Sequence, residues 1–148
     1  RSARLYQKLI RGQMALSFST DVDKMKDPGL FTITVEGIQE GYTPEDVESA
    51  IYAELEKLRE EGVSDRELQK AKNQKEARLI FGLQGNFIRG IRIGSSLAES
   101  GDPLFFLKML ERYRQATAEE LLRVAREYFN RKNRVVVRLL PETWAKGP

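Results

Sequence analysis

The chain has 148 residues, a net charge of +3, and neither cysteine nor histidine. Without cysteine there are no disulfides or thiolate metal sites, and without histidine there is no Ser-His-Asp triad and no imidazole metal site. Basic and acidic side chains, 25 and 22 in number, are mixed along the chain, which argues against a nucleic-acid-binding face. No apolar run approaches the ~20 residues that span a bilayer.

The first predicted element is a helix over residues 2–11, with Leu5, Leu9 and Ile10 on one side. Gly12 follows directly and is a common helix terminator.

Two strands with alternating apolar and polar residues follow, over residues 14–20 and 29–37. A polar connector joins them, so the simplest pairing is antiparallel. The side chains predicted to face inward are Met14, Leu16 and Phe18 in the first strand and Phe31, Ile33 and Val35 in the second.

A helix over residues 43–61 is predicted from Thr43 as N-cap and Pro44 at the first helical position. Ser64 and Glu67 then form an S-x-x-E capping box that opens a long helix. A glycine break near residues 82–85 separates this helix from a second one, which runs to Gly101.

The C-terminal third is predicted to hold two helices and a strand. Asp102-Pro103 predicts the start of a helix over residues 104–114. This helix has more apolar residues than one face requires, so we expect it to be buried between layers. Thr117 and Glu120 form another capping box for a helix ending at Phe129. Residues 134–140, RVVVRLL, are predicted to be the last strand. Runs of strands and of helices together predict an α+β fold, a two-layer antiparallel sheet packed against helices.

Three features of the sequence are candidate functional sites. The aspartates of residues 21–27 lack the glycine and the glutamate of a calcium-binding loop, so a solvated loop is favoured. Glycines 82, 85, 90 and 94 match no phosphate-binding pattern and no strand precedes them, so helix packing is favoured. Arg11 could reach a peptide carbonyl or carboxylate, or could simply be a cation at a helix C-terminus, where the helix dipole favours it.

The ordered set SARLYQKLIR, GLFTITVEG, GVSDRELQKAK and ATAEELLRVAREYF resembles the C-terminal, inactive domain of the insulinase, pitrilysin and mitochondrial processing peptidase family. The resemblance covers residues 2–142, nearly the whole chain. It implies homologous domains in pairs that face each other across a chamber, one of them with an H-x-x-E-H zinc site. This chain has no histidine and is therefore expected to lack zinc, with the zinc held by the partner catalytic domain.

In many family members the inactive domain contributes an arginine and, shortly after it, a tyrosine that contact the substrate. The resemblance places the arginine at Arg11, the substrate-binding candidate, but puts Leu16 where the tyrosine is expected. Family domains also have at least one strand and one helix before the SRLY-like segment. We therefore expect residues 1–142 to be a partial domain lacking its first strand and helix, and residues 143–148 to be a flexible tail.

The resemblance implies a non-catalytic domain that closes the substrate chamber and helps to bind extended peptides. The alternative is a structural or assembly module from a member that has lost proteolysis, and Leu16 fits this alternative slightly better. The expected partners are a homologous catalytic domain or subunit and a peptide substrate, with edge-strand pairing between fragments. The compartment stays open, with the bacterial periplasm favoured.

Adding zinc to the purified chain should give no peptide hydrolysis, because no histidine is present to hold the metal. The measurement is cleavage of a quenched fluorescent peptide with and without ZnCl₂. Robust cleavage that a chelator abolishes would contradict the assignment as a non-catalytic domain.

Overall fold

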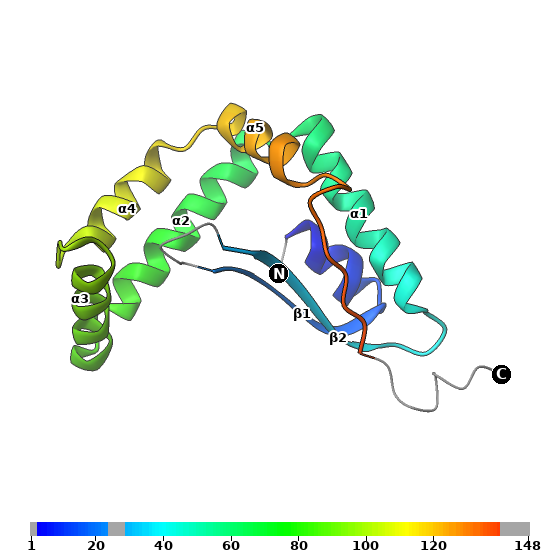
Figure 1. The fold of residues 1–148 in the computed structure, drawn as a ribbon, viewed down its shortest axis with the longest axis horizontal. Helices are drawn as coiled ribbons and strands as arrows, with labels where there is room; N and C mark the ends of the chain where they lie inside the picture. Colours follow the sequence, from blue (N-terminus) through cyan, green and yellow to red (C-terminus); the bar gives the residue numbers. More distant parts are fainter. Residues whose placement is uncertain (1–2, 24–28, 140–148) are drawn as a thin grey trace. The chain divides into compact units, whose positions relative to one another are not determined.

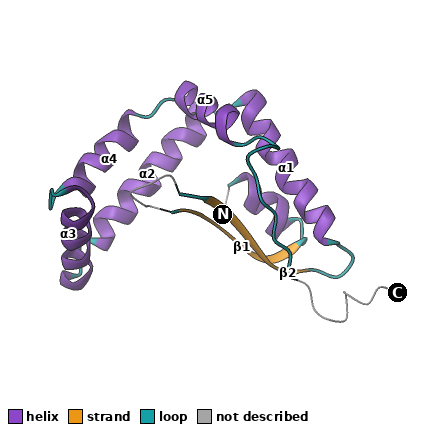
Figure 2. Ribbon diagram, viewed as in Figure 1, coloured by secondary structure: helices purple, strands orange, loops and turns teal. Residues whose placement is uncertain are grey.

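The computed structural model describes residues 3–23 and 29–139 (Figure 1). The chain divides into two compact units, residues 1–57 with 126–148, and residues 58–125. The strands, drawn in orange in Figure 2, belong to the first unit by their residue numbers, and the regular elements of the second are helices. Each unit is described by itself.

The first unit holds a π-helix, η1 (Tyr6–Arg11), and a hairpin of two strands, β1 (Ala15–Val22) and β2 (Phe31–Ile38). It also contains most of α1 (Pro44–Glu61). The strands pair antiparallel as predicted, from Ala15 opposite Ile38 to Val22 opposite Phe31. Within the described residues, the sheet has only these two strands.

The core of this unit joins the helices to the hairpin. Leu9 of η1 is fully buried and clusters with Met14 and with Val47 and Ala50 of α1. Phe18, Val35 and Ile38 of the hairpin pack around this cluster, partly buried. The predicted α+β architecture, with helices packed against an antiparallel sheet, is confirmed.

The predicted inward face of the first strand is wrong at Leu16. Ala15 is buried, whereas the Leu16 side chain is 71% exposed. A Cβ placed on Gly37 would lie 2.5 Å from Leu16 Cδ1, so Leu16 lies across the bare backbone of Gly37. Because Gly37 has no side chain, Leu16 finds close contact there without facing the core.

The helix N-termini follow the predicted caps. Asp46 N–H donates to Thr43 Oγ1 over 3.2 Å, and the Asp46 carboxylate accepts from the Thr43 amide over 2.8 Å. These Thr43 hydrogen bonds hold the pKa of Asp46 below its usual value. The box of Ser64 and Glu67 is also present and opens the first helix of the second unit.

The second unit holds α2 (Asp65–Gly82), α3 (Asn86–Ser100), α4 (Phe105–Gln115) and most of α5 (Ala118–Tyr128). The break between α2 and α3 lies where the glycines predicted it. Both α2 and α3 pack against α4. The box of Thr117 and Glu120 opens α5, whose Leu122 side chain lies against Gly62.

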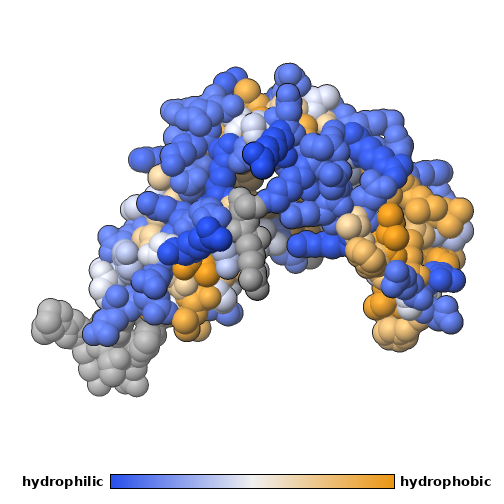
Figure 3. Space-filling model, turned by 180° about the vertical axis from the view of Figure 1, so that it is seen from behind, coloured by the Kyte–Doolittle hydropathy of each residue, from blue (hydrophilic) through white to orange (hydrophobic). Residues whose placement is uncertain are grey.

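Helix α3 has its apolar side outward. Its one buried residue is Ser96, whereas Phe87 is 78% and Leu97 53% exposed. Gly90 and Gly94 face open space. Figure 3 shows the resulting apolar surface over this part of the second unit. An exposed apolar surface of this kind commonly marks an interaction site.

The expected burial of the helix near residues 104–114 is wrong. No residue of α4 is buried, and Leu104 and Leu107 are exposed. The apolar side chains of α4 are therefore at most partly buried, although α2 and α3 both contact this helix.

The predicted last strand is also wrong over residues 134–139, which form no strand, while Leu140 and the predicted tail 143–148 lie outside the described residues. The segment is nevertheless ordered along α1 (Figure 1). Arg138 pairs with Glu45 and Glu48, and Arg134 lies over the Tyr52 ring, 3.9 Å from its centroid. Side-chain contacts to a helix thus replace the backbone pairing that the pattern predicted.

Replacing Ser64 by Ala should lower the free energy of unfolding by about 1 kcal/mol, because the Glu67 amide then loses the N-cap hydroxyl that accepts its hydrogen bond. Urea denaturation at neutral pH measures the change. Ser95→Ala, an exposed position inside α3, is the control and should be neutral or slightly stabilising. Equal effects at both positions would contradict the capping role.

Candidate functional site

The predicted substrate contact, Arg11, is the last residue of η1. This short helix is a π-helix, a form rare in proteins and frequent at functional sites. Gln13 follows with φ of 54°, the one left-handed non-glycine residue in the described part of the chain. Met14 N–H donates to Leu9 O over 2.9 Å and closes the turn.

Two buried side chains fix this turn. Leu9 and Met14 belong to the core cluster, and the residues between them bulge outward. Arg11 is therefore exposed. The Tyr42 hydroxyl donates to the carbonyl of Gly12 over 3.4 Å and ties the turn to the loop before α1. The backbone that carries Arg11 is thus held on both sides.

The side chains of Lys8 and Arg11 have no hydrogen-bond or ion-pair partner among the residues that the structure describes. Both lie in the last turn of η1, where the helix dipole favours cations. Their charges are therefore available to a ligand, and carbonyl or carboxylate oxygens of a peptide are suitable acceptors.

A shallow concavity lies between η1 and α1. It is lined by Lys8, Met14, Tyr42, Asp46, Ser49 and Ala50 among others. Met14 and Ala50 give it an apolar floor, while the Asp46 carboxylate is already engaged by its cap. Among the residues that the structure describes, the lining of the concavity thus offers the Lys8 cation, the Ser49 hydroxyl and a small apolar surface.

Leu16, where the resemblance expects a tyrosine, is exposed and has no hydroxyl. Sequence reasoning missed Tyr42, whose hydroxyl donates to this turn, because Tyr42 lies 31 positions after Arg11 in the chain. It also missed Lys8. The available signal was the spacing of Lys8 and Arg11, because residues three positions apart on a helix lie on the same side.

A second polar cluster joins α1 to residues 134–139. Arg138 holds the pKa of Glu48 below its usual value by hydrogen bonding to the carboxylate, and Tyr52 adds a further hydrogen bond. Burial and the neighbouring Glu48 raise the pKa of Tyr52. Every ionisable group of this cluster is paired, so the cluster is structural.

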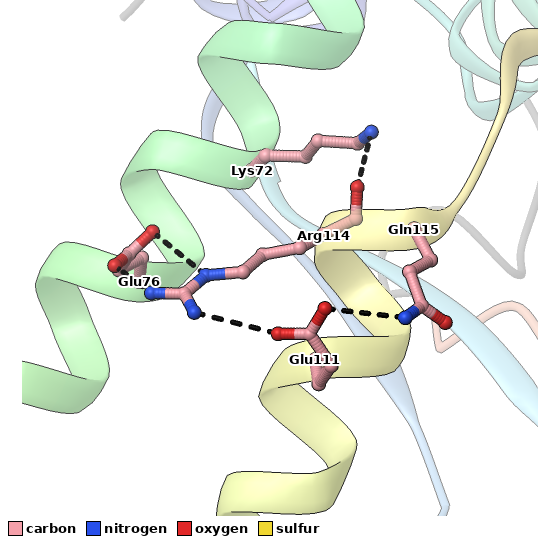
Figure 4. A network of polar contacts seen from close by, with 5 residues as sticks. All are labelled: Lys72, Glu76, Glu111, Arg114 and Gln115. Atoms are coloured by element: carbon pink, nitrogen blue, oxygen red, sulfur yellow. Dashed lines mark hydrogen bonds and ion pairs between the residues drawn. The ribbon is translucent and has the colours of Figure 1, made fainter.

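Two lysines of α2, Lys72 and Lys75, make structural contacts with α4 (Figure 4). Lys72 Nζ donates to the Arg114 carbonyl over 2.7 Å, and Arg114 in turn pairs with Glu76 and Glu111. Lys75 lies 4.8 Å from the centre of the Tyr113 ring. These contacts tie α2 to α4 and so occupy cations that a nucleic-acid-binding stripe would need free.

Neither a metal site nor a membrane span is found in the described part of the chain. No group of three or more Asp, Glu, His or Cys side chains is placed to hold a metal ion there. Asp21 accepts a hydrogen bond from the Val22 amide, while residues 24–28 of the aspartate-rich loop lie outside the description. No helix there has the length and apolar content to cross a bilayer.

The fold and site define an α+β domain with a basic turn on its surface. Residues 1–75 match the profile of the family described as the peptidase M16 inactive domain. The chain belongs to this family, and the resemblance seen in the sequence is confirmed.

Solved structures share the fold. A candidate zinc protease from Bordetella pertussis Tohama I is 25% identical, with a TM-score of 0.77 over 95% of this chain and 76% of that one. The inactive peptidase domain of a candidate zinc protease from Bordetella parapertussis is 26% identical and has a TM-score of 0.80. The match covers 95% of this chain and 75% of that one.

A protease from Helicobacter pylori is 25% identical, with a TM-score of 0.71 over 87% of this chain and 31% of that one. A search of curated protein sequences gives no significant match.

Replacing Arg138 by Gln should raise the pKa of Glu48 towards its ordinary value of 4.5, because the guanidinium that favours the carboxylate is lost. A depressed folded-state pKa stabilises the fold above the unfolded pKa, and this stabilisation is lost as pH falls through the folded value. The variant should therefore be less stable than wild type at pH 7, with a smaller difference at pH 3. Carboxyl NMR titration and urea denaturation measure both effects.

The control for this experiment is Arg92→Gln on α3, an exposed arginine far along the chain from the cluster. It should leave the Glu48 titration unchanged. An unshifted Glu48 pKa in the Arg138 variant would contradict the assigned cause.

Proposed function

We propose that this chain is the non-catalytic domain of a zinc metallopeptidase, which closes the substrate chamber and helps to bind extended peptides. The observation that carries the proposal is the match to the inactive-domain family in a chain that has no histidine. The zinc and its activated water then belong to a homologous catalytic domain or subunit. Residues 1–142 form the domain in this proposal.

The basic turn is the proposed peptide contact. Lys8 and Arg11 project from a backbone that buried side chains fix, and no partner in the described chain occupies their charges. An extended peptide exposes backbone carbonyls at regular spacing, and a fixed arginine can donate to them with little loss of side-chain freedom. Tyr42 supplies a hydroxyl beside the same turn.

The alternative is a structural or assembly module of a family member that has lost proteolysis. Two observations favour it. Leu16 provides no hydroxyl where the family resemblance expects one, and α3 presents its apolar side to solvent. An uncovered apolar helix face suits a docking surface better than a peptide-binding one.

Arg11→Ala should weaken binding of an unfolded polypeptide about tenfold, because a charge-assisted hydrogen bond is lost. The probe is fluorescein-labelled casein, and the readout is fluorescence anisotropy of the purified chain. Arg11→Lys keeps the charge but loses the forked pair of guanidinium donors, so its affinity for casein should lie between those of wild type and Arg11→Ala.

The matched control is Arg92→Ala, an exposed arginine on α3, which should bind as wild type does. Wild-type affinity in the Arg11 variant would exclude Arg11 as the contact. No casein binding by any form would contradict the peptide-binding role and favour the assembly module.

A further inference from the structure

We propose that Tyr42 is a positioning residue, whose hydroxyl fixes the backbone that carries Arg11. The segment that it holds is the basic turn (residues 8–14), which leads from η1 into β1. This role deepens the function proposed above and rests on it in one respect, since the position of Arg11 matters to binding only if Arg11 contacts the peptide.

The basic turn has a backbone conformation that needs restraint. Gln13 has φ of 54°, a left-handed conformation that residues with a side chain rarely adopt. Gly12 N–H donates to Gln7 O over 3.1 Å, and a Cβ at Gly12 would lie 2.2 Å from the Lys8 carbonyl oxygen. Gly12 therefore lies directly against the last turn of η1. Because Arg11 precedes it in the chain, a movement of Gly12 also moves Arg11.

The loop between β2 and α1 braces the basic turn. Gln39 N–H donates to Met14 O over 3.0 Å, which attaches the loop to the end of the basic turn. Tyr42 N–H donates to Gln39 O over 3.2 Å and closes a β-turn. Gly41, at the third position of this β-turn, has φ of 89°, the left-handed value that a type II turn requires there. The loop thereby returns the chain to the basic turn at Tyr42.

Tyr42 is held at both ends of its side chain. Its ring packs, half-buried, against the buried cluster around Leu9. Its hydroxyl donates to the Gly12 carbonyl over 3.4 Å. A tyrosine side chain turns about only two bonds, so the packed ring also fixes the hydroxyl. Since the hydroxyl proton is given to Gly12, Tyr42 acts on the backbone of the basic turn.

A held backbone matters for binding because a mobile one must be ordered when a ligand binds, and this ordering lowers the affinity. Removing the hydroxyl should therefore weaken a contact made by Arg11 while leaving Arg11 itself intact. The hydrogen bond is long, so the expected effect is moderate. Tyr42→Phe keeps the packed ring and loses only the hydroxyl, so this variant should fold.

The order of the basic turn can be measured in the purified chain without any peptide. NMR relaxation of the backbone amides should give order parameters of about 0.85 at Arg11 and Gly12 in wild type, and lower values in Tyr42→Phe. Tyr128→Phe is the matched control, because it removes the hydroxyl of a tyrosine on α5 that is 52% exposed. It should leave both values unchanged. Wild-type order in Tyr42→Phe would overturn the proposal.

The left-handed residue gives a rescue test. Asparagine adopts a left-handed backbone more readily than glutamine, so Gln13→Asn should recover part of the order that Tyr42→Phe loses at Gly12. In the wild-type background, where Tyr42 already holds the turn, the same substitution should change little. Gln13 is exposed, so the substitution leaves the core packing intact. A gain in order no larger in Tyr42→Phe than in wild type would overturn the proposal.

Coupling to Arg11 separates positioning from general support of the fold. Tyr42→Phe should weaken casein binding about threefold in the wild-type background. It should have no further effect in Arg11→Ala, where the positioned side chain is missing. An equal loss in both backgrounds would overturn the positioning role, because Tyr42 would then act independently of Arg11. Tyr128→Phe should bind casein as wild type does.

Failure of the proposed function and failure of this inference give different results. If wild type binds casein and Tyr42→Phe binds it equally well, the positioning role is wrong while the peptide-binding role stands. If no form of the chain binds casein, the peptide-binding role is wrong, and the order parameters decide the role of Tyr42. A loosened turn in Tyr42→Phe then supports the brace, and an unchanged turn overturns it.

Discussion

The packing of Leu9 against Met14, Val47 and Ala50 connects the parts of the first unit. Leu9 is the largest side chain that is fully buried in the described chain, and its neighbours come from the turn after η1 and from α1. The same contact fixes the ends of the turn that carries Arg11. Truncating a buried leucine typically costs about 2–5 kcal/mol, so the fold and the candidate site depend on one small cluster.

Features set by neighbouring residues were predictable from the sequence. The caps at Thr43, Ser64 and Thr117 depend on side chains three positions away, and all three are present. Features set by distant residues were not. Leu16 is exposed because Gly37 lies beneath it, and residues 134–139 follow α1 because glutamates on that helix hold Arg138. Alternation indicates a strand-like backbone but does not identify its partner.

The same distinction applies to the candidate site. Arg11 could be singled out because its place at a helix end is local. Tyr42 and the concavity between η1 and α1 depend on which helix packs beside η1, and that is a tertiary contact. The outward apolar side of α3 is a further case, since periodicity finds the apolar stripe but not the side on which neighbours lie.

The way α1 holds residues 134–139 also bears on proteolysis. An extended backbone with free amides has the conformation in which proteases bind their substrates. Arg134 and Arg138 are the side chains that a trypsin-like enzyme would recognise, but Arg134 lies over the Tyr52 ring and Arg138 pairs with Glu45 and Glu48. Exposed ion pairs weaken as salt rises. We therefore expect added salt to loosen the hold of α1 on this segment and to make the segment easier to cut.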